Sequence, residues 1–190
     1  MAAPSESRIK GISFRTFLQS LERLKGAEAV SATLALLPED LRQKLASGVI
    51  FTGSWYPLTW YQELHAASQR ATGGGLELAR QIGFQNIKSD LDGVYRIFVA
   101  VMSPAFIMAR SAALFHQYHD PGDMEIVESG DNFARARWSH CGGFNRSGWE
   151  NVIGAVEAAL AAVGVKDVVT ERVQGGNDGD DAMELIARWR

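Results

Sequence analysis

The chain has 190 residues, a formal net charge of −3 and a hydrophobic fraction of 46%. This length suits a single domain with a sizeable core, and no apolar run approaches the roughly 20 residues that span a bilayer. The 19 basic and 22 acidic residues are intermixed, which argues against a surface that binds nucleic acid. The N-terminal residues lack the apolar core of a secretory signal, and the single cysteine excludes an intramolecular disulfide. We therefore expect a cytoplasmic protein without a membrane span.

The first 120 residues have the pattern of a helical lobe. Residues 13–25 repeat large apolar side chains at helical spacing, and Gly26 follows them, a residue type common at helix ends. Pro38 and Pro57 each precede a helical pattern. Proline is favoured where a helix begins, so both residues indicate helix starts. A further helix is expected over about 76–87.

Two more helices are expected before residue 121. The spacing from Ser89 to Asp92 fits a capping box, with aspartate in the less usual third position, and an apolar helical stripe follows. Ser103 and Pro104 form a strong start signal for the second helix, with serine as the cap and proline in the first helical position.

After Pro121 the apolar period changes from helical to alternating. The segments 124–129 and 133–138 flank a glycine-bearing turn and predict a β-hairpin. A helix is expected over about 147–163, followed by two strands, VKDVVTERV and AMELIARW. The expected fold class is α+β: an N-terminal helical lobe (1–120), then a four-stranded antiparallel sheet with the order ββαββ (121–190). We expect both lobes to share one core within a single domain, 1–190.

The chain lacks the familiar signatures of catalysis. No paired carboxylates, GxSxG elbow, GxGxxG fingerprint or HExxH pair occurs in it. Cys141 follows His140 directly, and a nucleophilic cysteine needs such a base within reach. We expect a chain without enzymatic activity. A thiol enzyme centred on Cys141 stays as the alternative.

Aromatic residues gather in the stretch SWYPLTWY and around a glycine-rich corner between residues 138 and 149. Large rings line ligand pockets, although they also fill protein cores. We expect a binding site for a small apolar or lipid-like ligand, with a filled core as the alternative reading. The side chains expected to line that site are Trp60, Phe98, Phe115 and Trp149.

The stretch FHQYHD, residues 115–120, carries two histidines three residues apart. Residues at this spacing share a helix face, so His116 and His119 could together meet one metal ion. They also fall in the last helical turn, where the helix dipole favours cationic or polar side chains. We expect a solvated helix end with Phe115 and Tyr118 packed inward, and we keep the metal site as the alternative.

Three runs of the chain carry a resemblance: WYPLTWYQELHAASQRATGG, LDGVYRIFVAVMSPAFIMARSAALFHQYHDPGDMEIVESGDNFARARW and GDDAMELIARW. They resemble an uncharacterised paralogous family that is expanded in myxobacteria. More distantly, the layout is similar to haem-nitric-oxide/oxygen-binding (H-NOX) domains, to 4-vinyl-reductase-like ligand-binding domains and to the small subunits of the TRAPP vesicle-tethering complex. The resemblance implies that a helical lobe and a sheet together hold a ligand.

The likeness to H-NOX domains implies that particular positions should carry haem-binding residues. This sequence has other residues at those positions. Their haem-ligating histidine would fall near Ala112 or Ala113, neither of which can ligate iron. Their Tyr-x-Ser-x-Arg motif, which holds the haem carboxylates, aligns on Ser139 and leaves Arg137 and Cys141 at its outer positions. We therefore expect no cofactor, with haem as the alternative.

The sequence thus predicts a non-catalytic sensory or adaptor module that binds a small apolar ligand or a protein partner. The alternatives are a haem or metal sensor that uses His116, His119 or His140, and the thiol enzyme at Cys141. The exposed edge strands of the expected sheet need cover, so we also expect a homodimer.

Overall fold

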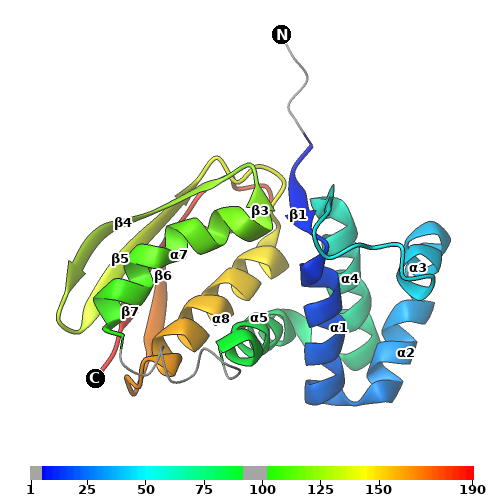
Figure 1. Cartoon of the computed structure of the whole chain (residues 1–190), viewed down its shortest axis with the longest axis horizontal. Coiled ribbons are helices and arrows are strands. Elements are labelled where there is room, and N and C mark those ends of the chain that lie inside the picture. The colour runs from blue at the N-terminus through cyan, green and yellow to red at the C-terminus, as the bar shows by residue number, and fades with distance from the viewer. Residues whose placement is uncertain (1–5, 92–101) are drawn as a thin grey trace, which may run out of the picture.

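The computed structural model describes residues 6–91 and 102–190 of the chain (Figure 1). Five helices form its N-terminal part: α1 (Ile12–Lys25), α2 (Ala27–Ala35), α3 (Glu39–Ala46), α4 (Leu58–Thr72) and α5 (Gly75–Leu91). The sequence does not predict α2, because AEAVSATLA has no apolar stripe. It follows α1 directly because Gly26, with a φ of 87°, lets the chain turn in one residue.

The helix expected to begin at Ser89 lies largely outside the described residues. Within them α5 continues to Leu91 and contains Ser89, whose hydroxyl donates to the carbonyl of Gln85 at 2.8 Å. A serine inside a helix can bond in this way to the carbonyl four residues earlier, so its position alone does not mark a helix start. The capping-box prediction at Ser89 is therefore wrong.

The C-terminal part contains the expected four-stranded antiparallel sheet. Its strands are β4 (Asp123–Gly130), β5 (Phe133–Ser139), β6 (Val169–Gly175) and β7 (Met183–Arg188), in the order β4-β5-β7-β6. Alternate residues of β5 are buried, and between them Arg135 and Arg137 form ion pairs with Glu184 of β7 on the outer face. The α+β fold class and the ββαββ order are confirmed.

Two helices cover the inner face of this sheet, α7 (Pro104–Tyr118) and α8 (Arg146–Ala162) (Figure 1). Ser103 caps α7 by accepting a hydrogen bond from the backbone N–H of Phe106 at 3.1 Å, as the sequence predicts. Asn145 caps α8 in the same way, through the N–H of Gly148 at 2.9 Å. Although α7 precedes residue 121, it packs against the sheet.

A second, small sheet with the order β2-β1-β3 is not predicted by the sequence. Its strands are β1 (Arg8–Lys10), β2 (Trp55–Pro57) and β3 (His119–Asp120). Strands of two or three residues are too short to show an alternating pattern. Ile9 of β1 pairs with His119, and Arg8 forms an ion pair with Asp120, so this sheet ties the N-terminus to the end of α7.

Helices α5 and α8 approach each other through two glycines. A Cβ atom on Gly83 would stand 1.9 Å from the carbonyl oxygen of Asn151, and one on Gly154 would stand 1.9 Å from that of Arg80. The absence of side chains at both positions therefore lets the two backbones touch. Figure 1 shows α5 between α1 and α8, so this contact joins the helical part to the sheet and its covering helices.

One hydrophobic cluster extends through both parts of the chain. It includes Leu64 of α4, Ile82 of α5, Leu160 of α8 and Leu185 of β7, all nearly inaccessible to solvent. Within the described ranges, no helix combines the length and the apolar character needed to cross a bilayer.

Candidate functional site

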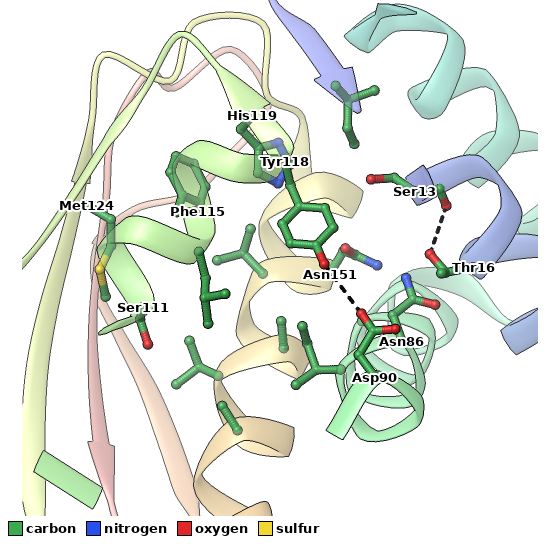
Figure 2. Close-up of a pocket in the computed structure, with 18 of the residues that line it drawn as sticks. Ser13, Thr16, Asn86, Asp90, Ser111, Phe115, Tyr118, His119, Met124 and Asn151 are labelled. Carbon is green, nitrogen blue, oxygen red and sulfur yellow. Dashed lines mark hydrogen bonds between the residues drawn. The ribbon is translucent and has the colours of Figure 1, made fainter. Parts of the chain in front are cut away.

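A cavity of about 190 Å³ lies between α7 and the helices that face it (Figure 2). Side chains of α1, α5, α7 and α8 form its walls, and Met124 of β4 and Trp138 of β5 close the side toward the sheet. Most of the lining is apolar, with a few polar groups gathered near α1 and α5. Apolar pockets with a few convergent polar groups are the usual form of small-molecule sites.

The end of α7 supplies three of the lining side chains, Phe115, Tyr118 and His119. Phe115 and Tyr118 share a helix face because they are three residues apart. His119 ends the helix with an extended backbone and enters β3, and its ring stacks on that of Phe115, with centroids 4.7 Å apart and planes at 26°. The small sheet thus holds His119 against the cavity.

His119 has an unusual electrostatic environment. The residue is partly buried, but its Nδ1 atom is enclosed and has no hydrogen-bond partner among the described residues. Burial lowers the pKa of His119 to about 4, because the protonated ring loses its hydration. The imidazole is therefore neutral near pH 7, which is the form that binds metals.

His116 does not share this environment. Its side chain is about half exposed, and its Nε2 lies 3.8 Å from a carboxylate oxygen of Asp123. His140 lies on the other side of that carboxylate, with Nδ1 at 3.0 Å. Across residues 6–91 and 102–190, no group of three or more His, Cys, Asp and Glu side chains is placed to hold a metal ion. His116 and His119 therefore face different surroundings instead of one ion.

Cys141 lacks the surroundings of a nucleophile. The residue is fully buried, and its thiol lies 3.3 Å from the carbonyl oxygen of Ser139, to which it donates. Burial raises the pKa of Cys141 to about 12, so the thiolate is strongly disfavoured. The neighbouring His140 ring turns away to Asp123. This geometry gives no support to the thiol-enzyme alternative.

The four aromatic residues expected at a ligand site are dispersed. Phe115 lines the cavity, whereas Phe98 lies outside the described residues. Trp60 stacks on Tyr56 at 5.9 Å, in the helical part, and Trp149 is fully buried against Phe144 at 4.6 Å. Neither tryptophan is among the residues that line the cavity.

The polar lining residues escape notice in the sequence. Ser13 and Thr16 of α1, and Asn86 and Asp90 of α5, face the cavity (Figure 2). One signal points to the first two, since they lie on the same helical face as the buried Phe17. Small polar residues on an otherwise apolar face can mark a lined cavity instead of a filled core.

His65 is a second buried histidine, away from the cavity. It is 1% exposed, both ring nitrogens lack partners among the described residues, and burial lowers its pKa to about 3. The rings of Phe17 and Tyr61 meet it edge to face at 4.8 and 4.9 Å. The structure thus places His65 inside the helical core.

Comparisons with known proteins define the fold. No family model and no curated protein sequence matches the chain. Solved H-NOX structures do match, each over 96% of this chain. They include the Fe(II) unliganded H-NOX protein from K. algicida (14% identity, 97% of that chain, TM-score 0.70) and an oxygen-binding H-NOX domain related to soluble guanylate cyclases (15%, 95%, 0.69). A third, from a study of haem distortion in the H-NOX family, has 14% identity, 95% coverage and a TM-score of 0.67. The chain therefore has an H-NOX-like fold.

These neighbours correct the expectation that the chain has no cofactor. They include an Fe(II) protein, an oxygen complex and a protein used to study haem distortion, so the proteins that share this fold include haem proteins. The expectation relied on two missing motifs, which is too narrow a basis, because a histidine elsewhere on the cavity wall can also provide an iron ligand. The missing motifs did not indicate that the chain has the H-NOX-like fold, which the structure comparison shows.

The cavity fits a haem in one respect and not in two others. The enclosed, neutral ring of His119 suits an iron ligand. However, a cavity of about 150 Å³ in another protein holds only benzene, so a haem needs far more than 190 Å³. None of the described lining residues is a lysine or arginine, and Arg137 pairs with Glu184 on the outer face of the sheet. The haem carboxylates thus have no cationic partner among the described residues of the cavity wall.

Proposed function

We propose that the chain is a sensory domain that binds haem in the cavity between α5 and α7, with His119 as the iron ligand from the protein. The observation that carries this proposal is that the neutral imidazole of His119 lines the cavity and that its Nδ1 has no hydrogen-bond partner among the described residues. The H-NOX-like fold supports it, because the neighbours include Fe(II) and oxygen-bound proteins. When bound, the haem would supply an iron that can coordinate a diatomic gas.

The residues around His119 hold its ring in place. Phe115 stacks on one face of the imidazole, and pairing of β3 with Ile9 of β1 fixes the backbone. The ion pair between Arg8 and Asp120 adds a second tie to the same segment. A ligand histidine held in this way keeps its orientation without a hydrogen bond to its second nitrogen.

The cavity must widen to admit a haem, which requires α7 and α5 to move apart. The one hydrogen bond found between side chains of α5 and α7 in the described ranges joins the hydroxyl of Tyr118 to Asp90, at 3.4 Å. A bond of this length contributes little, about 0.5 kcal/mol. By contrast, the backbone contact between α5 and α8 leaves no room for movement.

The test is reconstitution of the purified full chain with ferric haem, followed by absorption spectroscopy. We expect a Soret band that saturates at one haem per chain. Replacing His119 with alanine should shift or abolish this band, since the iron loses its ligand, whereas His116→Ala should leave it unchanged because His116 lies outside the cavity. A spectrum that is the same in wild type and H119A, or the absence of saturable binding, would reject the proposal.

The cavity volume favours a second candidate function, the sensing of a smaller apolar ligand without iron. Its 190 Å³ suits a ring-sized molecule with no movement of α7. Native mass spectrometry of the protein purified from bacterial cells tests this candidate. A colourless protein that carries a bound small molecule would support it, and a mass equal to that of the bare chain would count against it.

A further inference from the structure

The cavity lining is divided into a polar and an apolar side. Ser13, Thr16, Asn86 and Asp90 gather on the side of α1 and α5, and Figure 2 shows the hydroxyl of Tyr118 pointing toward the same end. The opposite side is built from apolar residues of α7, α8 and the sheet, among them Ile107, Phe115, Met124, Val152 and Val156. A ligand with one polar end would therefore lie with that end toward α5.

Most hydrogen-bond donors at the polar side are already engaged within the protein. The hydroxyl of Thr16 lies 3.3 Å from the carbonyl of Ile12 and 3.2 Å from that of Ser13. On the other side of the cavity, the hydroxyl of Ser111 of α7 donates to the carbonyl of Ile107 at 3.0 Å. The amide N–H₂ of Asn151 donates to the carbonyl of Ala79 at 3.3 Å. These groups stabilise the helices, and they leave few donors for an acidic ligand.

Asp90 is the lining residue with an uncompensated charge. Its hydrogen bond from Tyr118 is long, at 3.4 Å, and no cationic side chain of the described residues lies within ion-pair distance of it. Burial raises the pKa of Asp90, while the Tyr118 hydrogen bond and the charge of Arg15 oppose that rise only in part. Asp90 as a whole is exposed, so its carboxylate is only partly shielded from water, and among the described residues it makes no ion pair.

We propose that the cavity selects ligands with a ring-sized apolar body and a cationic or hydrogen-bond-donating head group, which binds to Asp90, and that it disfavours anionic head groups. The inference rests on the proposed role of the cavity as the ligand site, but it does not require haem.

Two observations define the expected ligand. The volume of 190 Å³ exceeds the roughly 150 Å³ that holds benzene, so a fused bicyclic ring is a suitable body. Among the described residues, the charged groups that act on the polar end are Asp90, which lines it, and Arg15, whose charge acts on Asp90 but which is not part of the lining. A head group that enters the cavity therefore meets the carboxylate first.

Three compounds with the same ring and different charge test this inference. Indole is neutral, tryptamine carries an ammonium group and indole-3-acetate carries a carboxylate. We expect isothermal titration of the full chain at pH 7 and low salt to give the tightest binding for tryptamine and the weakest for indole-3-acetate. A partly exposed charge pair justifies a preference of about threefold to tenfold at each step.

Asp90→Asn is the decisive variant, because it removes the charge and keeps the size of the side chain. We expect it to abolish the advantage of tryptamine and to tighten binding of indole-3-acetate. Asp131→Asn, in the exposed hairpin turn, removes the same charge at a distance and should leave the order unchanged. This control separates the effect of Asp90 from that of net charge.

Several outcomes would overturn the inference. They are equal binding of the three compounds, tighter binding of indole-3-acetate, an unchanged order in D90N, or no binding of any compound. Failure here is distinct from failure of the haem proposal, which depends on a Soret band that requires His119. A His119-dependent Soret band without the indole preference would leave the proposed function standing and reject only the role of Asp90.

Discussion

Two of the helices around α5, α8 and α7, meet it in opposite ways. Against α8 it packs backbone to backbone, because Gly83 and Gly154 have no side chains to separate the helices. Against α7 it leaves a cavity, which one long hydrogen bond between Tyr118 and Asp90 spans. The first contact fixes how the two parts of the chain are joined, and the second leaves space for a ligand. Stability and binding are therefore assigned to different faces of one helix.

The largest effect is expected at the close contact. Gly154→Ala would place a Cβ atom 1.9 Å from the carbonyl oxygen of Arg80, which the backbone must move to relieve. We expect a loss of about 3 kcal/mol in the free energy of unfolding, measured by urea denaturation, although alanine is otherwise the better helix former. Gly53→Ala, where a Cβ atom meets nothing within 4 Å, is the control and should cost less than about 0.5 kcal/mol. Equal losses in the two variants would mean that the helices do not touch there.

The next effect concerns acid stability and compares the two buried histidines. The pKa of His65 in the folded protein is about 3, below the value of about 6.5 in an unfolded chain. The unfolded state therefore binds more protons at acid pH. The contribution of His65 to the free energy of unfolding is complete above pH 6.5 and is lost as the pH falls toward the folded pKa. His119, with a pKa of about 4, acts in the same direction.

His65→Leu should remove the larger share of this acid sensitivity. Between pH 6.5 and 4.5 we expect the wild type to lose about 2 kcal/mol more than the variant, measured by urea denaturation at each pH. His116→Leu changes an exposed histidine and serves as the matched control, with a pH dependence like that of the wild type. A pH dependence in H65L that equals that of the wild type would show that His65 does not resist protonation.

The smallest effect is expected across the cavity. Tyr118→Phe removes the hydroxyl that donates to Asp90 at 3.4 Å and keeps the ring. We expect a cost of about 0.5 kcal/mol by urea denaturation, since the bond is long and partly exposed to water. A loss as large as that of G154A would mean that α7 is held to α5 as firmly as α8 is, and that the cavity cannot widen easily.

The parts of the fold that the sequence predicts are those with a long, regular apolar period. Helix α8 and strands β5 and β7 have such a period, and their bounds differ from the prediction by only one or two residues. The strands β1, β2 and β3 are too short for any period, and α2 has no stripe of apolar residues. Both depend on contacts with distant segments, which a local pattern does not contain.

The site was harder to predict because its walls come from segments far apart in the chain. Among the expected ligand residues that the structure describes, Phe115 is the one that lines the cavity, and the polar group opposite it, Asp90, has no local signal. His119 was expected at a solvated helix end with the dipole as its partner. Its Nδ1 is instead enclosed, because the end of α7 pairs with β1. That pairing joins residues more than a hundred positions apart.

The most direct measurement is a haem titration of the wild type and of Ala155→Phe, followed by absorbance. Ala155 lines the cavity from α8, so a phenyl ring at this position would occupy the space without touching His119 chemically. We predict saturable binding in the wild type and at least about tenfold weaker binding in A155F, with both proteins folded by circular dichroism. Equal affinity in the two proteins would place the haem outside the cavity and refute its role as the ligand site.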